Sequence, residues 1–304
     1  MMPPERFIHE PGRQQWCHGP IDLHLQAEGE PEVMEAAFQR GWAEFEGMLT
    51  ALVQELPLLR RSIRPEDINP LQGPVAKIMW QACHALAGHD DAGFITPMAA
   101  VAGAVSQRLL RHFELPGVRR AAINNGGDIA LHLSPGASWS MGLVSDAPSA
   151  WWAGHDDVPI RPDARFVIHH SMPVRGVATS GWSGRSLSRG IADSVTVLAA
   201  SAAGADAAAT MIANRVNIEH PGVVRRPAHT VRDDSDLGEI LVTCHVPALG
   251  VGEITTALGR GLAYAQGLVD RGLIHAALIA CQNRYAACGL ESYWEADIQG
   301  DLAA

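Results

Sequence analysis

Three short segments of this 304-residue chain combine side chains that could bind a charged ligand. In Asn125-Gly126-Gly127-Asp128, two glycines permit positive φ angles and let backbone N–H groups point at an oxyanion. In Thr179-Ser180-Gly181, followed by Arg185, hydroxyls, amides and a guanidinium could orient a phosphate. Asp206 and Thr210 are four residues apart, so on a helix they share one face. A carboxylate and a hydroxyl placed in this way suit Mg²⁺, which keeps water and phosphate as its other ligands.

Each segment also has a purely structural interpretation, and the residues alone leave both open. Asn-Gly-Gly-Asp is a favourable hairpin turn. The residues after Thr179 could form a solvated turn that carries a surface arginine. Asp206 could lie in the first turn of its helix, where a carboxylate offsets the helix dipole.

The spacing of apolar residues predicts the elements that position these segments. Helices are expected over residues 31–56, 74–88, from 96 onward, 204–213 and 253–269. In the third helix, Thr96 is the expected N-cap, and the small residues from Met98 to Val105 indicate either tight packing or contact with a cofactor. Strands are expected over 19–25, 121–123, 129–133, 139–144, 165–171, 175–179, 194–200, 239–246 and 273–280. Loops are expected over 145–164 and 219–238, and the tail from residue 282 has no clear pattern.

Helices and strands interleave in this prediction, but short turns connect the central strands. Short connections favour an antiparallel sheet packed with helices, an α+β fold, over a doubly wound parallel sheet. The absence of a low-complexity linker favours a single domain over residues 1–304.

Composition narrows the classes of function. The chain has 23 basic and 33 acidic residues, a net charge of −10, and this balance argues against nucleic acid or an anionic membrane as partner. With 47% apolar and 18% charged residues it can bury a core, yet it has no apolar run long enough to span a membrane. Five cysteines without a CxxC pair, and no apolar run near the N-terminus, predict a reduced, cytoplasmic protein.

The order of the motifs resembles the ApbE-like flavin transferase family. The small-residue helix is followed by the Gly-Gly-Asp hairpin, the Ala-Thr-Ser-Gly strand end, the Asp-Ser-Val-Thr-Val strand and the Ala-Asp-x-x-x-Thr helix, within residues 94–214. The segment from His18 to Leu23 also resembles a branch of this family that has no assigned reaction.

The resemblance implies a T-fold-like α+β fold that binds FAD, or another dinucleotide, together with Mg²⁺. Many members transfer FMN to a threonine of a target flavoprotein and release AMP. It further implies that Asp206, Thr210 and a backbone carbonyl near Ala99 hold the metal. The matching nucleotide-binding positions are Asn125, Gly126, Gly127, Asp128, Thr179, Ser180, Gly181 and Arg185.

One stretch departs from the family pattern. The transferases have His-x-x-Asp-Pro-x-Thr-Gly where residues 185–192 here are Arg-Ser-Leu-Ser-Arg-Gly-Ile-Ala, and Ala102 replaces the usual lysine before Gly103. No catalytic base is therefore assigned, although His169 and His170 lie nearby in the sequence.

Two main functions stay open at this point. One is Mg²⁺-dependent action at the FAD pyrophosphate, either FMN transfer or FAD hydrolysis. The other is a non-catalytic flavin carrier or assembly factor. A third, an interaction protein, rests on Trp151 and Trp152. The expected partners are a flavin nucleotide and a target flavoprotein or redox enzyme, and a homodimer is one option.

Overall fold

The computed structural model describes residues 3–88, 94–143, 164–184, 186–233, 235–290 and 301–302. Internal contacts group the chain into two compact units, each discontinuous in sequence. Unit 1 comprises Met1–Ser138, His169–Ala178 and Leu198–Ala208; unit 2 comprises Trp139–Ile168, Thr179–Val197 and Ala209–Ala304. The single domain expected over residues 1–304 stays a prediction.

Unit 1 is built on an antiparallel sheet, as the sequence predicted. Its strands follow the order β1 (Glu5–Glu10), β2 (Arg13–His18), β3 (Ile21–Gly29), β4 (Val118–Asn125), β5 (Asp128–Leu133) and β8 (Gly176–Ser180). Each neighbouring pair in this order is antiparallel. The sequence did not predict β1, because five of its six residues are exposed and it lacks the alternation of a half-buried strand.

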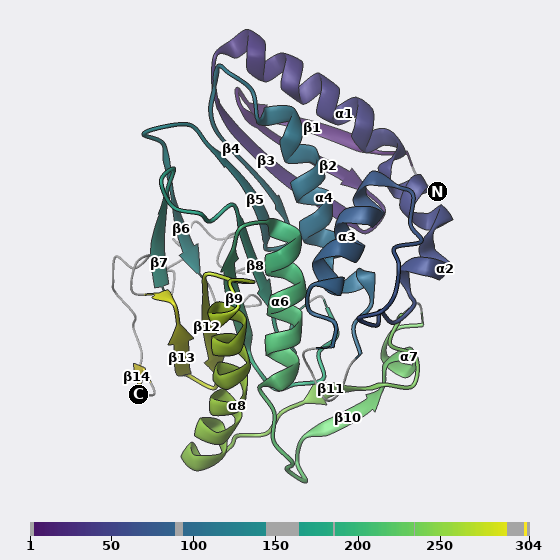
Figure 1. Cartoon of the computed structure of the whole chain (residues 1–304), viewed down its shortest axis with the longest axis vertical. Helices are drawn as coiled ribbons and strands as arrows, with labels where there is room; N and C mark the ends of the chain where they lie inside the picture. The colour runs from purple at the N-terminus through teal and green to yellow at the C-terminus, as the bar shows by residue number, and fades with distance from the viewer. Residues whose placement is uncertain are drawn as a thin grey trace. The chain divides into compact units, whose positions relative to one another are not determined.

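The helices of unit 1 lie on one face of this sheet (Figure 1). They are α1 (Pro31–Gln54), α2 (Leu56–Leu59), α3 (Pro74–His84), η1 (Pro97–Ala100), α4 (Val101–Leu110) and η2 (Arg111–Phe113). The predicted N-cap position of Thr96 is confirmed, but its side chain makes no capping bond and the chain first forms the 3₁₀ turn η1. Ala100 has φ −127° and ψ 15°, outside the α-helical region, so α4 begins one residue later.

Aromatic side chains form much of the core between α1 and the sheet. Trp16 of β2 is fully buried, and its ring centroid lies 5.5 Å from that of Trp42 and 5.6 Å from that of Phe45. Phe38 contacts it edge-on, and the Arg6 guanidinium lies 5.8 Å from the Trp16 ring centroid. The apolar stripe that predicted α1 is therefore the face that covers β2 and β3.

Unit 2 contains a second set of neighbouring strands, covered by one long helix. The end of β8, β9 (Ser194–Ala199), β12 (Ala276–Cys281), β13 (Arg284–Cys288) and β14 (Asp301–Leu302) follow in that order. α8 (Val251–Asp270) packs on β12 and β13. β6 (Ser138–Leu143) pairs with β7 (Ala164–His169), and β10 (Val224–Pro227) with β11 (Leu241–His245). The division between units falls inside β8, β9 and α6 (Ala202–Arg215).

One prediction for this part of the chain was wrong, since residues 219–238 contain β10 and the short helix α7 (Ala228–Val231) rather than loop alone. The tail after residue 282, for which no structure was predicted, begins with β13. β10 is an Arg-Arg-containing strand without buried side chains, so it has no apolar pattern to detect. The expected loop with Trp151 and Trp152 lies outside the described residues.

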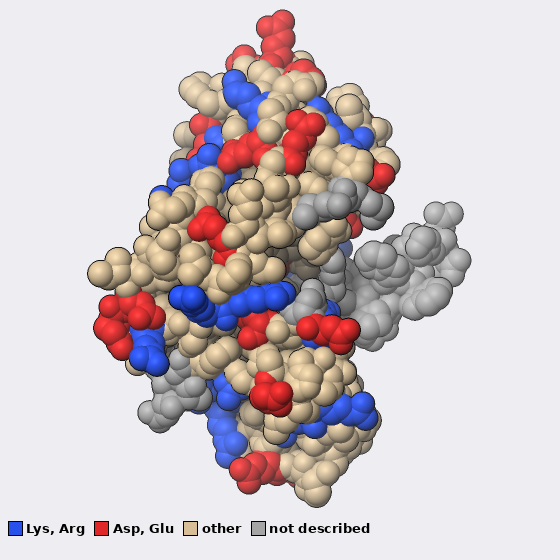
Figure 2. Space-filling model, turned by 90° about the vertical axis from the view of Figure 1, so that its right-hand side faces the viewer, with Lys and Arg blue, Asp and Glu red and all other residues tan. Residues whose placement is uncertain are grey.

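Charged side chains of both signs lie on the surface (Figure 2). On the face drawn in Figure 2, acidic and basic side chains are interspersed among uncharged ones. In the described part of the chain, no helix combines the length and apolar character needed to cross a membrane.

Candidate functional site

The carboxylate of Asp206 lies at the first turn of α4 in unit 1. Its Oδ2 accepts a hydrogen bond from the backbone N–H of Gly103 at 2.9 Å, and the N–H of Ala102 also donates to the carboxylate. These two N–H groups have no partner within their own helix, because the first turn of any helix leaves its donors free. Asp206 therefore caps α4 from a different helix.

This position corrects the dipole interpretation of Asp206. α6 begins at Ala202, two residues earlier than expected, so Asp206 lies in the second turn and no acidic residue occupies the first. Its charge faces the N-terminal end of α4 instead of that of its own helix.

Burial raises the pKa of Asp206 to about 7, and the hydrogen bonds from Gly103 and Ala102 offset only part of that effect. A carboxyl with such a pKa exchanges its proton near neutral pH. A cation beside it would favour the ionised form.

The small residues of α4 are explained by its close contact with the start of α6. A Cβ atom on Gly103 would overlap the backbone of Ala202. Next to this contact, the side-chain oxygen of Gln107 accepts a hydrogen bond from the N–H of Ala203 at 3.2 Å. Tight packing, the structural alternative considered for this helix, is therefore confirmed at Gly103.

The Asn-Gly-Gly-Asp segment forms the expected hairpin turn and packs on the same helix. Gly126 and Gly127 have φ angles of 67° and 111°, which favour glycine. The Asn125 side-chain amide donates to the Ala102 carbonyl at 3.3 Å, and the carbonyl of Asp128 accepts a bond from the Ser106 hydroxyl at 2.9 Å. Asn125 and Asp206, 81 positions apart (206 − 125), thus both bind Ala102.

The turn offers fewer free amides than the oxyanion interpretation assumed. The N–H of Gly127 already donates to the side-chain oxygen of Asn124 at 2.8 Å. Asn125 and Asp128 are both buried, at 8% and 9% exposure. Their direct structural role is to fix the hairpin against α4.

Besides Asp206, the residues predicted to hold Mg²⁺ are Thr210 and Ala99, which carry oxygen donors of the type that a hard cation accepts. Thr210 follows one turn later on the same helix, and Ala99 lies in η1, where its N–H donates to Thr96. No group of three or more His, Cys, Asp or Glu side chains that could hold a metal occurs among the described residues. A cation here would therefore need hydroxyl, carbonyl, water or phosphate oxygens, which is the usual donor set for Mg²⁺. The Asp206 carboxylate keeps lone pairs beyond its two N–H bonds.

The Thr-Ser-Gly segment belongs to unit 2, at the end of β8. The hydroxyl of Thr179 is hydrogen-bonded to that of Thr196 on β9 at 2.9 Å, and Ser180 is 8% exposed. Gly181 has no space for a side chain, because a Cβ atom would overlap the carbonyl of Asp193. The predicted Arg185 lies outside the described residues.

The stretch that departs from the transferase pattern is anchored by polar contacts in unit 2. The Asn214 side chain accepts a bond from the N–H of Arg189 at 2.8 Å, and the N–H of Thr243 donates to the Ser188 carbonyl at 2.8 Å. Residues 186–192 contain no His, Asp or Glu that could act as a base. Of the two histidines considered for that role, a ring nitrogen of His170 is hydrogen-bonded to the Leu133 carbonyl at 2.6 Å, while His169 is exposed.

Sequence reasoning missed two residues beside the Thr-Ser-Gly segment. The indole N–H of Trp182 donates to the carboxylate of Asp193 at 3.3 Å. Both lie at the predicted motifs without having been assigned a role, since Trp182 follows Gly181 directly and Asp193 is the first residue of the Asp-Ser-Val-Thr-Val segment.

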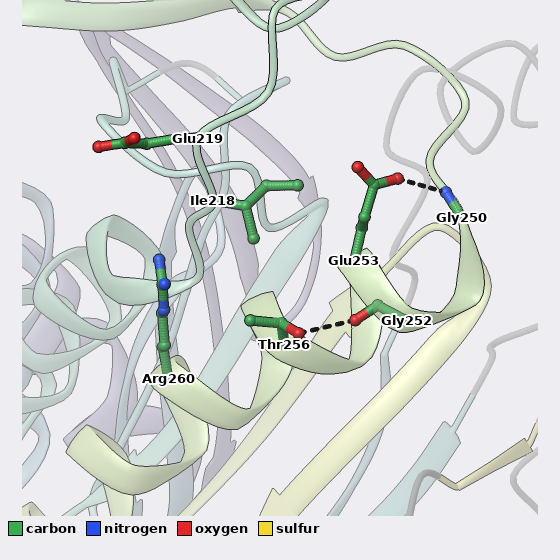
Figure 3. A pocket seen from close by; sticks show the side chains of 7 residues that line it. All are labelled: Ile218, Glu219, Gly250, Gly252, Glu253, Thr256 and Arg260. Atoms are coloured by element: carbon green, nitrogen blue, oxygen red, sulfur yellow. Dashed lines mark hydrogen bonds between the residues drawn. The ribbon is translucent and has the colours of Figure 1, made fainter.

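A separate cavity of about 510 Å³ lies in unit 2 at the start of α8 (Figure 3). Glu253 points toward the backbone N–H of Gly250, which donates to its carboxylate at 2.8 Å. None of the predicted site residues is among those that line it, which are Ile218, Glu219, Gly250, Gly252, Glu253, Thr256 and Arg260.

Comparison with known proteins identifies the family of this chain. A family model described as AbpE bacteria matches residues 5–289, nearly the whole chain. The chain belongs to this ApbE-like family. The resemblance inferred from the motif order is confirmed, and the match extends beyond the residues that first suggested it.

Relatives of this ApbE-like chain include archaeal proteins named UPF0280. The protein of Methanosphaerula palustris is 32% identical over 196 residues, which are 62% of this chain and 73% of that protein. The protein of Methanococcus vannielii is 32% identical over 69% of this chain and 78% of its own length. The protein of Methanothermobacter thermautotrophicus is 42% identical, but the chain spans only 43% of its length.

Two solved structures of ApbE proteins are also similar to this ApbE-like chain. A variant of the flavin transferase ApbE of Vibrio cholerae has 13% identity and a TM-score of 0.37, with 90% of this chain and 93% of that chain covered. The ApbE protein of Thermotoga maritima has 15% identity and a TM-score of 0.31, with 82% and 71% covered. The α+β assignment rests on the helices and antiparallel strands described above.

Proposed function

We propose that the chain binds a flavin dinucleotide, FAD, together with Mg²⁺ and acts at the pyrophosphate. The observation that supports this most is the place of Asp206, a carboxylate that joins the first turn of α4 near the Asn-Gly-Gly-Asp hairpin in a member of the ApbE-like family. In this proposal Asp206, Thr210 and the carbonyl of Ala99 hold Mg²⁺. A bound Mg²⁺ would offset the negative charge of the pyrophosphate.

The other residues would bind and orient the nucleotide. Backbone and side-chain groups of the Asn125–Asp128 hairpin and of the Thr179–Gly181 segment supply amide and hydroxyl donors. Arg185 would add a guanidinium that pairs with phosphate oxygens. This donor set needs no cluster of lysines, which suits a chain with a net charge of −10.

A second candidate function is a flavin carrier or assembly factor without catalysis. It is favoured by the absence of His, Asp and Glu from residues 186–192, since FMN transfer to a threonine needs a base for the acceptor hydroxyl. FMN transfer and FAD hydrolysis remain the two concrete versions of the enzyme, and the acceptor would be a flavoprotein or redox enzyme.

Calorimetry followed by product analysis tests the proposal. The purified chain is titrated with FAD with and without Mg²⁺, and the mixture is then analysed for AMP and FMN by chromatography. We expect Mg²⁺-dependent binding. Appearance of AMP or FMN would support the enzyme, whereas binding without either product, with or without a threonine-bearing flavoprotein, would support the carrier. Failure of FAD to bind in the presence of Mg²⁺ would refute the cofactor assignment.

The raised pKa of Asp206 predicts a pH dependence of this binding. Metal binding needs the ionised carboxylate, and the pKa of Asp206 is about 7, so affinity for Mg²⁺ with FAD should rise about tenfold between roughly pH 6 and pH 8. The contribution of Asp206 to the folding stability of the ligand-free chain should change with pH in the opposite direction. Its folded state holds the Asp206 proton more tightly than its unfolded state, so this group favours folding more as the pH falls below about 7. Calorimetry across the pH range checks the first effect, and the profile should flatten in Asp206→Asn.

A further inference from the structure

The indole of Trp182 is a partly exposed aromatic surface at the end of β8 in unit 2. It follows the buried Ser180 and the tightly packed Gly181 directly. Two hydrogen bonds hold it, from its backbone N–H to the Ala192 carbonyl at 3.0 Å and from its indole N–H to Asp193 at 3.3 Å. The backbone bond fixes the chain at Trp182, and the indole bond orients the ring.

Asp193, which accepts the indole bond, is itself held on three sides. Its backbone N–H donates to the Ala280 carbonyl of β12 at 2.9 Å, and its own carbonyl packs against Gly181. Its second carboxylate oxygen accepts the backbone N–H of Gln282, in the turn between β12 and β13. The two oxygens of the Asp193 carboxylate thus connect Trp182 with the β12–β13 turn through hydrogen bonds.

The β12–β13 turn, which donates the Gln282 N–H to the Asp193 carboxylate, is itself held by several contacts. Gln282 and Asn283 have φ angles of 45° and 60°, a conformation that non-glycine residues adopt at a cost in free energy. The Gln282 side chain holds the chain before α8 at two points, since its oxygen accepts the N–H of Leu249 at 2.9 Å and its amide donates to the Pro247 carbonyl at 2.6 Å. Residues with such φ angles persist where the surrounding structure holds them, and the bonds of the Gln282 side chain hold this turn. The Gln282 N–H in turn positions the Asp193 carboxylate.

We propose that Trp182 stacks on a planar ring of the flavin dinucleotide and that Asp193 is the positioning residue that fixes its indole. This inference rests on the proposed function. A rigid aromatic side chain binds a ring system with little loss of conformational entropy, and base–aromatic stacking contributes measurably to nucleotide binding. The isoalloxazine and adenine rings share this chemistry, and the ligand fragments FMN and AMP distinguish them.

Replacement of Trp182 by leucine tests the stacking. We expect Trp182→Leu to weaken FAD binding by about tenfold and Trp182→Phe to stay within about threefold of the wild type. Trp80→Leu is the matched control, because Trp80 is also partly exposed but lies on α3 in unit 1, where it stacks on His84. Calorimetry with FMN and with AMP then shows which ring loses affinity in Trp182→Leu.

The role of Asp193 has a readout that does not depend on a ligand. When the protein is labelled with 5-fluorotryptophan, the ¹⁹F resonance of Trp182 is the one that is absent from the spectrum of the Trp182→Phe variant. Asp193→Ala removes both acceptor oxygens, so it should shift that resonance and reduce FAD affinity, while the other tryptophan resonances stay in place and report an intact fold. An unshifted resonance would refute the positioning role.

The two proposals fail in distinguishable ways. FAD binding by the wild type with unchanged affinity in Trp182→Leu would overturn the stacking proposal and leave the proposed function intact. Failure of the wild type to bind FAD at all would overturn both.

Discussion

Replacement of Asp206 by alanine should weaken binding of FAD in the presence of Mg²⁺ by about 100-fold, or about 2.8 kcal/mol. The substitution removes the one carboxylate proposed to hold the cation. It also removes the acceptor for the N–H groups of Ala102 and Gly103 at the start of α4. Calorimetry with FAD at fixed Mg²⁺ measures the change in affinity.

Two further variants separate cation binding from capping of α4. Asp206→Asn keeps a side-chain oxygen that can accept the Gly103 N–H but carries no charge, so it should lose Mg²⁺-dependent affinity while unfolding at nearly the wild-type temperature. Asp270→Ala is the matched control, since Asp270 is a carboxylate on α8 that accepts a bond from Gln266. Equal FAD affinity in the wild type, Asp206→Ala and Asp206→Asn would contradict the role of Asp206.

Replacement of Gly103 by alanine should destabilise the fold by about 3 kcal/mol. The new Cβ atom would overlap the backbone of Ala202, and backbone cannot move aside as a flexible side chain can. The variant must therefore separate the start of α6 from α4, which also displaces Asp206. Urea unfolding followed by circular dichroism measures the loss.

Gly259 offers the matched control for that substitution. It lies within α8, and nothing approaches within 4 Å of a Cβ atom built on it. Gly259→Ala should raise stability by about 0.5–1 kcal/mol, because alanine has the higher helix propensity. If both glycine variants changed stability alike, close packing at Gly103 would not be the cause.

The sequence was most informative where local chemistry and structure agree. The apolar stripe from Met34 to Leu56 predicted α1, which ends at Gln54, and two adjacent glycines predicted the turn between β4 and β5. Both are local signals, since helix periodicity and positive φ are properties of neighbouring residues.

The missed features depend on contacts between residues far apart in the chain. The capping of α4 by Asp206 joins residues 103 positions apart (206 − 103), and no local pattern marks it. The bond from Trp182 to Asp193 likewise needs the ends of β8 and β9 to lie side by side. β10 was missed for a different reason, because an exposed strand of charged residues is stabilised by pairing with β11 rather than by burial.

The aromatic cluster around Trp16 gives unit 1 an optical probe of its own. An indole with no exposed surface, packed against Phe38, Trp42 and Phe45, emits at shorter wavelength than a solvated one. Loss of the packing between α1 and the sheet would therefore shift the fluorescence of the chain to the red without any label. A variant with Trp16 as phenylalanine would identify that contribution, and the melting of this unit could then be followed in dilute solution.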